Sequence, residues 1–391
     1  MTDRIPPSSW ASTRPTRRGF LAGCASCAAA VGAAGGIGLA PARRASAASI
    51  ERGLVHAHRS PWFEAMDQGL IQCTLCPRAC VVPGGKRGQC EVRENRGGAY
   101  YSLVYGNPCS IHADPVEKKP FFHVLPGSKS FSLATAGCNF DCKFCQNWEI
   151  SQATPELTFN YDLPPDQIVE LALEYDCATI ASTYVEPTVF FEYMLDIARA
   201  ATPRGLRSVM HSNGFINAAP QAELMPHLTA ACIDLKGITE DYYREMTGGR
   251  LAPVQDSLVR YRDHGIHLEL VNLMIPTHND SPDDVRRLCD WVAESLGPDT
   301  PVHFSRFMPL YKLTNLPPTP VETLERAHGI AREAGLRFPY LGNVPGNDAE
   351  NTYCPACGEL LIRRFHYRTE VVALVGNRCN NCEENIPGIW D

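Results

Sequence analysis

Eleven of the seventeen cysteines in this chain stand in three short groups, and this grouping constrains the fold more than any other feature. Disulfide scaffolds are typical of short secreted chains with scattered cysteines, whereas metals and iron–sulfur clusters need several thiolates at one point. We therefore expect the fold to gather each group around a metal or cluster. The groups are Cys73, Cys76, Cys80 and Cys90; Cys138, Cys142 and Cys145; and Cys354, Cys357, Cys379 and Cys382.

Residues 1–47 have the pattern of an export signal. The pair Arg17-Arg18 precedes an uncharged run, Gly19–Ala40, in which 14 of 22 residues are Gly or Ala, and residues 45–47 read Ala-Ser-Ala, a small-residue cleavage site. Such weak hydrophobicity favours a cleaved twin-arginine signal over a membrane anchor. We expect an exported, periplasmic protein that meets the membrane only during export. A cytoplasmic location and a lipoprotein signal ending at Cys24 are the alternatives.

The remainder of the chain is acidic. The whole chain has a net charge of −7, and beyond residue 47 there are 30 basic and 42 acidic residues, a balance of −12. The acidic remainder of the chain repels a phosphate backbone, so we do not expect nucleic acid as a partner. The 391 residues exceed the ~100–200 expected of one domain, so we expect several folded units.

The sequence divides into four parts after residue 47. We expect a linker at 48–60, a small Cys-rich N-terminal domain at 61–128, a core at 129–345 and a metal ribbon at 346–391. In the core, short apolar runs alternate with amphipathic helical stretches, which indicates parallel βα units. Six units predict a partial (β/α)6 barrel in the α/β class, with its chemistry at the carboxyl ends of the strands. The expected strands are Phe131–Thr135, Ala178–Tyr184, Leu206–His211, Ala231–Leu235, Leu268–Ile275 and Val302–Phe307, and the expected helices include Pro165–Tyr175, Thr188–Ala200, Ser281–Ser295 and Val321–Ala334.

The central cysteine group directly follows the first of these strands, in the run Cys138-Asn-Phe-Asp-Cys142-Lys-Phe-Cys145. Iron–sulfur cubes are usually held by four thiolates. Three ligands in one loop leave one iron open, which is useful when another molecule must bind there. A zinc knuckle completed by His211 or another Cys is the alternative.

Several segments together carry a family resemblance. They are Cys73-Thr-Leu-Cys76-Pro-Arg-Ala-Cys80, the loop from Cys138 to Cys145, Tyr184-Val-Glu186-Pro187-Thr188, Ile233-Asp234-Leu235-Lys236-Gly237, Asn272-Leu-Met-Ile-Pro276, His303-Phe-Ser-Arg306-Phe and the terminal Cys pairs. The chain resembles the radical S-adenosylmethionine (SAM) superfamily, within it the pyruvate formate-lyase activating enzymes, and most narrowly the radical SAM enzymes of the AmmeMemoRadiSam gene cluster.

This resemblance implies an enzyme with a [4Fe–4S] cluster and SAM as cofactors. Reduction of the cluster, which needs an electron donor, cleaves SAM to a 5′-deoxyadenosyl radical that abstracts hydrogen from a substrate. The substrate is a small molecule or a glycine in a partner protein, as in glycyl-radical activation. The resemblance does not name it.

The resemblance also implies a set of SAM-binding residues. Glu186 would bind the methionine ammonium, and Asp234 with Lys236 would contact the ribose and carboxylate. Glu186 could instead be an exposed residue at a helix start, and the Asp–Lys pair a surface ion pair. Ser212 and Asn213 are further candidate contacts, whereas His211 occupies a position that is an Asp in pyruvate formate-lyase activators. His303 and Arg306 would touch adenosine or substrate, or His303 would be a core residue.

The two flanking cysteine sets differ in regularity. Cys354-x2-Cys357 and Cys379-x2-Cys382, separated by 21 residues, have the spacing of a zinc ribbon, with a rubredoxin-like iron or an auxiliary Fe–S cluster as alternatives. The C-x2-C-x3-C-x9-C set from Cys73 to Cys90 favours neither zinc nor a second cluster. A non-catalytic metal-ribbon module and an exported electron-transfer protein remain alternative functions.

Overall fold

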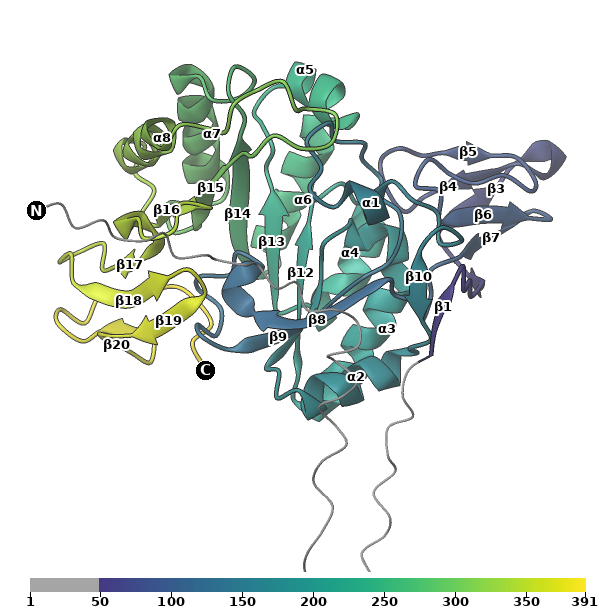
Figure 1. The fold of residues 1–391 in the computed structure, drawn as a ribbon, viewed down its shortest axis with the longest axis horizontal. Coiled ribbons are helices and arrows are strands. Elements are labelled where there is room, and N and C mark those ends of the chain that lie inside the picture. The colour runs from purple at the N-terminus through teal and green to yellow at the C-terminus, as the bar shows by residue number, and fades with distance from the viewer. Residues whose placement is uncertain (1–48) are drawn as a thin grey trace, which may run out of the picture. The chain divides into compact units, whose positions relative to one another are not determined.

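The computed structural model describes residues 49–391, and the expected signal at residues 1–47 lies outside them. An eight-stranded sheet forms the centre of this part of the chain (Figure 1). Its strand order is β16-β15-β14-β13-β12-β11-β9-β8, and all neighbours pair in parallel except the antiparallel β8 and β9. The bounds are β8 (Ser110–Pro115), β9 (Lys129–Ala134), β11 (Thr179–Ser182), β12 (Arg207–Ser212), β13 (Ala230–Asp234), β14 (His267–Met274), β15 (Val302–Arg306) and β16 (Pro339–Gly342).

Each parallel strand before β16 is followed by helical segments that return the chain to the start of the sheet. The helices are α1 (Trp148–Ser151), α2 (Pro165–Glu174), α3 (Phe191–Ala201), α4 (Ala218–Leu224), α5 (Glu240–Tyr242), α6 (Leu251–Asp263), α7 (Pro282–Ser295) and α8 (Val321–Glu333). Helix α7 shows why they begin where they do: Ser281 accepts a hydrogen bond from Asp284 N at 3.1 Å, and Pro282 fills the first helical position.

The expected partial (β/α)6 barrel is confirmed, with two additions at its edges. Strand β16 continues the parallel sheet after the sixth unit, and β8 adds an antiparallel strand on the other side. Neither gives a strong sequence signal. Strand β16 is only four residues long and begins with Pro339, and β8 is a partly exposed edge strand with the sequence Ser-Ile-His-Ala-Asp-Pro.

The N-terminal part forms small antiparallel sheets. Strands β3 (Phe63–Ala65), β4 (Ile71–Cys73) and β5 (Val81–Val82) form one sheet, and β2 (His58–Arg59), β7 (Ala99–Ser102) and β6 (Arg93–Arg96) form another. The expected linker is corrected here. Strand β1 (Ile50–Arg52) pairs with β10 (Phe159–Tyr161), and β2 pairs with β7, so this segment contains two strands of the folded body.

A buried ion pair fastens these N-terminal sheets to the barrel. Arg93 on β6 is 1% exposed and donates to Glu192 on α3 through both terminal guanidinium nitrogens, the bond from Nη1 measuring 2.9 Å. Its Nε also donates to Val189 O at 3.1 Å. Loss of one partner of such a pair costs about 3–5 kcal/mol, because the other charge stays buried.

The C-terminal ribbon consists of two small sheets, drawn in yellow in Figure 1. The strands are β17 (Thr352–Tyr353), β18 (Leu360–Phe365), β19 (Arg368–Val371), β20 (Leu374–Val375) and β21 (Arg378–Cys379). Arg364 donates to Phe122 O at 2.6 Å and lies over the Phe122 ring, which joins the ribbon to the segment before β9. Within residues 49–391, no helix is long and apolar enough to cross a membrane.

Candidate active site

A cavity of about 510 Å³ opens at the carboxyl ends of the parallel strands. Its walls combine the three loop cysteines with polar side chains from the ends of four strands. They include Cys138, Cys142, Cys145, Glu186, His211, Ser212, Asn213, Asp234, Lys236 and Ser305. The open-sheet rule places ligands at this end of the strands, and the cavity obeys it.

The cysteine loop is held over the cavity by backbone hydrogen bonds. Asp141 N donates to Thr247 O at 3.1 Å, and Lys143 N donates to Met246 O at 3.0 Å. Cys138 Sγ accepts from Phe140 N at 3.4 Å, and Cys145 Sγ lies 3.2 Å from Ser151 Oγ. Hydrogen bonds to cysteine sulfur tune iron–sulfur centres.

Burial raises the pKa of the Cys138 thiol well above its ordinary value and raises that of Cys142 to about 12. A bound metal offsets such a shift, because it deprotonates a coordinating thiol. Three soft sulfur ligands on one cavity wall fit an iron–sulfur cluster, with the rest of the cavity left for a further ligand.

Glu186 follows β11 and is 2% exposed. Its Oε1 accepts three hydrogen bonds, from Thr188 N at 3.0 Å, Thr188 Oγ1 at 2.7 Å and Ser212 Oγ at 2.8 Å, while Oε2 accepts one, from Asn213 N at 2.7 Å. Burial nevertheless raises the pKa of this carboxyl. In residues 49–391 no cationic side chain pairs with it, so the carboxylate lacks a countercharge and Oε2 keeps acceptor capacity. An ammonium group of a ligand fits this position.

Asp234 and Lys236 meet at the end of β13. Lys236 Nζ donates to Asp234 Oδ2 at 2.6 Å, and His211 Nε2 lies 2.8 Å from Asp234 Oδ1. Burial alone would raise the pKa of Asp234, but the neighbouring Lys236 and His211 lower it below its ordinary value. The pair therefore lines the cavity as an ionised unit and is not a surface ion pair.

His303 is the candidate that the structure places elsewhere. It is 2% exposed, its Nε2 lies 2.8 Å from Glu269 Oε2, and its ring stacks on Tyr340 at 5.1 Å between centroids. It does not line the cavity, and it belongs to a buried network deeper in the barrel. Arg306 is likewise engaged elsewhere, donating to Thr319 O at 2.8 Å.

The sequence did not predict a buried ion-pair group next to the cavity, which reaches the cavity wall through Tyr184. Lys119, 1% exposed, donates to Asp114 Oδ2 at 2.8 Å and to Tyr184 OH at 2.9 Å, and burial lowers its pKa to about 8. Tyr184 lines the cavity and has a positive φ of 65°, which is strained for a tyrosine. Tyr184 belongs to a motif that the sequence reading used only for Glu186. Gln146, Asn147, Asn343 and Tyr367 also line the cavity and were not predicted.

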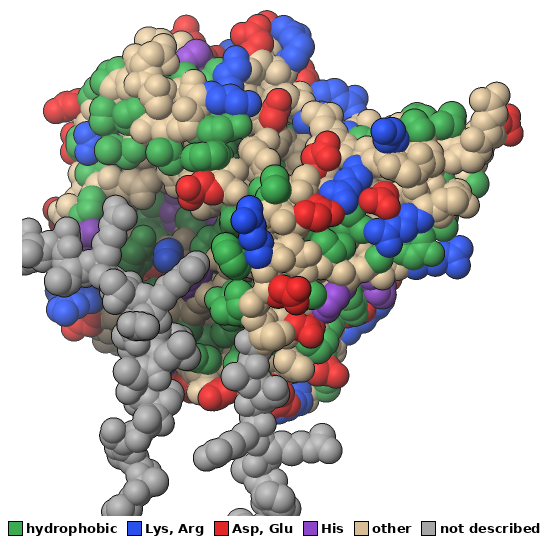
Figure 2. All heavy atoms as spheres, turned by 45° about the vertical axis from the view of Figure 1, so that its right-hand side comes forward, with side chains coloured by type: hydrophobic (Ala, Val, Ile, Leu, Met, Phe, Trp, Pro, Cys, Tyr) green, Lys and Arg blue, Asp and Glu red, His purple; other side chains and the backbone are tan. Residues whose placement is uncertain are grey.

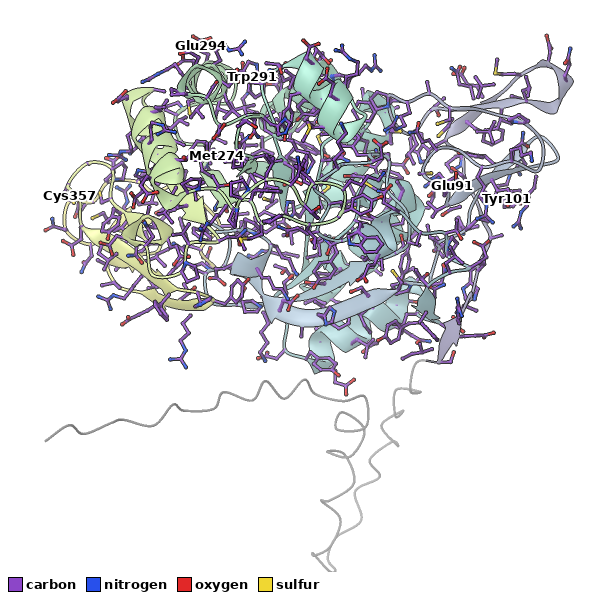
Figure 3. All side chains as sticks on the ribbon, turned by 45° about the horizontal axis from the view of Figure 1, so that its top comes forward. Glu91, Tyr101, Met274, Trp291, Glu294 and Cys357 are labelled. Atoms are coloured by element: carbon purple, nitrogen blue, oxygen red, sulfur yellow. The ribbon has the colours of Figure 1, made fainter. Side chains whose placement is uncertain are left out.

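The terminal cysteines form a compact metal-ligand set. The four sulfur atoms of Cys354, Cys357, Cys379 and Cys382 lie within 4.8 Å of one another. Cys354 Sγ and Cys382 Sγ are 3.5 Å apart, and Cys357 Sγ and Cys379 Sγ are 3.7 Å apart. Figure 3 shows Cys357 in an outer loop of the ribbon, on the opposite side of the barrel from Glu91 in the N-terminal part.

The four N-terminal cysteines also line one pocket together. Cys73, Cys76, Cys80 and Cys90 share it with Tyr100, Arg93, Arg78 and Asn139. The predicted convergence of this group is thus present in the structure.

The chain is similar to several known proteins. The family model of the radical SAM superfamily matches residues 132–292. An uncharacterised protein of Methanocaldococcus jannaschii is 44% identical over 327 residues, which span 83% of this chain and 97% of that protein. The pyruvate formate-lyase-activating enzyme of Clostridium pasteurianum is 21% identical over 160 residues, 39% of this chain and 65% of the enzyme. Among solved structures, a radical SAM methyltransferase from Sphaerobacter thermophilus aligns with a TM-score of 0.46 at 14% identity, over 78% of this chain and 81% of that one.

Proposed function

The chain belongs to the radical SAM superfamily, and we propose that it uses Cys138, Cys142 and Cys145 to hold a [4Fe–4S] cluster with an open iron. When bound and reduced, that cluster supplies the reductive cleavage of SAM to 5′-deoxyadenosyl radical and methionine. The radical abstracts hydrogen from a substrate that is a small molecule or a glycine of a partner protein. The observation that carries this proposal is the meeting of the three thiols and the uncompensated Glu186 carboxylate in one cavity.

Glu186 would hold the amino group of SAM. Its Oε1 is saturated by Thr188 and Ser212, so the carboxylate is fixed in orientation before a ligand binds. Its Oε2, with one protein donor, is free to accept from an ammonium. Because the carboxylate is buried, an ion pair there is worth more than one in water.

Asp234 and Lys236 would bind the ribose and carboxylate of SAM. Lys236 offers further N–H donors besides the one given to Asp234, and Asp234 offers acceptor sites besides those used by Lys236 and His211. The His211 contact holds Asp234 in place. Candidate substrate contacts come from the mouth of the cavity, where Tyr184, Asn343 and Tyr367 line the wall.

The test is anaerobic reconstitution with iron and sulfide, followed by SAM and a strong reductant, with 5′-deoxyadenosine quantified. Replacing Cys138, Cys142 or Cys145 by Ala should abolish its release and the SAM-responsive cluster signal. Cys177→Ala is the matched control, because Cys177 is a buried thiol two residues before β11, at the opposite end of that strand from the cavity. Full activity in any one of the three loop variants would exclude the open-iron assignment. A wild-type protein that holds iron but never cleaves SAM would instead favour an electron-transfer protein.

A further inference from the structure

The four N-terminal cysteines are brought together by one hairpin and the turn that follows it. Cys73 ends β4, and its backbone N–H donates to Cys80 O at 2.9 Å, which folds the Cys76–Cys80 loop back on the strand. Cys90 comes from the loop between β5 and β6, where Gly88 N donates to Arg93 O at 3.0 Å. All four side chains line the same pocket, so the set is a ready-made ligand group.

The spacing of these sulfurs differs from that of the terminal set. A zinc ion with four bonds of about 2.3 Å holds its sulfurs about 3.8 Å apart, as the terminal cysteines are held. In the part of the chain that the structure describes, the terminal set is the group that gathers around a single point, its ligand atoms within 4.8 Å of one another, and the N-terminal set does not gather in this way. In an iron–sulfur cluster the thiolates are shared among different irons, so a set that does not gather around one point suits a cluster better than a single ion.

The pocket also offers an unused hydrogen-bond donor. Arg78, which lines it, has its Nη2 buried without a partner, while its other nitrogens bond to Gln89 Oε1 at 2.9 Å and to Asn139 O. Arg93 lines the same pocket, but its charge is taken up by Glu192. A buried N–H donor beside the cysteines suits sulfide or thiolate sulfur, whose hydrogen bonds tune cluster potentials.

This pocket adjoins the cysteine loop of the active site. Cys90 and Cys138 both line one small cavity of about 60 Å³, and Asn139 lines both this cavity and the N-terminal pocket. Gly137, with φ 91°, lies so close to Cys90 that an added Cβ would come within 2.6 Å of Cys90 O. The loop therefore needs glycine here to approach the N-terminal cysteines.

Asn139 connects the two sites directly. Its backbone oxygen accepts from Arg78, and its side-chain oxygen accepts from Asn213 Nδ2 at 2.8 Å. Asn213 in turn donates its backbone N–H to Glu186. A single buried side chain thus separates the N-terminal pocket from the wall of the SAM cavity.

We propose that Cys73, Cys76, Cys80 and Cys90 bind a second iron–sulfur cluster, which accepts one electron at a time from a low-potential donor protein and passes it to the cluster of the active site. This rests on the proposed function, which consumes one electron for each SAM cleaved. In this transfer the donor protein loses one electron. The N-terminal cluster is reduced and then reoxidised, and the active-site cluster gains the electron, so the electrons balance.

The surface over the N-terminal pocket is mixed in charge, with Glu91 exposed beside Cys90, but it offers two basic side chains to an acidic donor. Arg250, exposed, donates to Pro77 O at 2.8 Å within the Cys76–Cys80 loop, and Lys86 is exposed on the turn before Cys90. In the described residues neither has an acidic partner. Figure 2 shows further Lys and Arg side chains, with acidic ones among them, over the N-terminal hairpins. A small low-potential electron carrier with an acidic surface is the donor class we infer, because opposite charges steer such an encounter.

The first test separates the two sites by metal content. A variant with Cys138, Cys142 and Cys145 all changed to Ala should retain about four irons per chain after reconstitution, in a spectrum unchanged by SAM. The wild type should hold about twice that iron, together with about one zinc in the ribbon. A loop variant that holds zinc and no iron in its N-terminal set would overturn the proposal. If both clusters are present but no 5′-deoxyadenosine is released, the proposed function fails and the cluster assignment stands.

The second test follows the electron. Cys76→Ser/Cys90→Ser should lower SAM cleavage about tenfold or more with reduced flavodoxin, but less than about twofold with dithionite, which reaches the active-site cluster directly. Cys177→Ser is the matched control and should change neither rate. Equal losses with both reductants, in a protein that keeps its SAM-responsive signal, would exclude the relay.

If the Cys76→Ser/Cys90→Ser variant does not fold, electron paramagnetic resonance of the reduced wild type tests whether two clusters lie close together. Spin–spin broadening that disappears in the loop variant supports two neighbouring clusters, and an unbroadened signal contradicts them.

Discussion

Glu186→Gln is the sharpest perturbation of the proposed SAM site, because the structure fixes what the amide would meet. Oε1 receives three hydrogen bonds, so an NH₂ group at that position would face three donors. The amide nitrogen must therefore take the place of Oε2. At the Oε2 position the amide nitrogen would face the backbone N–H of Asn213 and would point its own N–H groups at the amino group of SAM.

The substitution removes one charge-assisted hydrogen bond to the ligand, worth about 1.5–3 kcal/mol. Because 1.4 kcal/mol corresponds to a tenfold change in Kd, affinity for SAM should fall about 10- to 100-fold. The loss of the Asn213 bond also lowers the free energy of unfolding, by about 1–3 kcal/mol. Burial of the uncharged amide offsets part of this loss, because a buried carboxylate without a countercharge is itself costly.

The assay is equilibrium binding of S-adenosylhomocysteine, which carries the same amino acid moiety and is not cleaved in this way. Titration calorimetry on the reconstituted protein gives the Kd of wild type, Glu186→Gln and the control Glu170→Gln. Glu170 is a surface residue of α2 that pairs with Arg204 at 2.6 Å, so its variant should bind as the wild type does. A Kd for Glu186→Gln within twofold of wild type, in a folded protein with its cluster, would refute the ammonium assignment.

Three further predictions concern the ribbon, the barrel interior and the export signal. Cys357→Ser should lower the zinc content and the Tm while leaving SAM cleavage intact in the folded fraction, and iron with sulfide in the ribbon would contradict the zinc assignment. Burial alone would raise the pKa of Glu269, but hydrogen bonds and charge from His267 and His303 lower it below its ordinary value, and burial lowers the pKa of His123 to about 3. Both groups bind more protons in the unfolded chain than in the folded one. The free energy of unfolding should therefore decline as pH falls below about 6.5, because of His123, and again below about 4.3, because of Glu269. In urea titrations, Glu269→Gln should reduce the decline below about pH 4.3. We propose that the wild type is exported and shortened by about 47 residues. Changing Arg17 and Arg18 to Lys should then keep the full-length chain in the cytoplasm. A wild-type protein that is found uncleaved in the cytoplasm would contradict export.

The sequence alone determined which residues could ligate metal and which strand ends could carry the site. Spacing within a chain segment is fixed by covalent geometry, so the C-x3-C-x2-C loop and the ribbon pairs could be recognised without a fold. Continuous apolar runs likewise marked the parallel strands, because such strands are buried on both faces. Short or polar edge strands such as β8 and β16 carry no such signal.

Only the tertiary structure decided which polar residues share a cavity. His303 and Ser305 lie on the same face of β15, since side chains alternate along a strand, but they differ in depth by about 6.6 Å. Ser305 therefore reaches the cavity, whereas His303 stays below it with Glu269. The donors to Glu186 from the end of β12 and the contact of Cys90 with the active-site loop join residues far apart in sequence. Such contacts follow from the packing of whole elements, which local pattern does not encode.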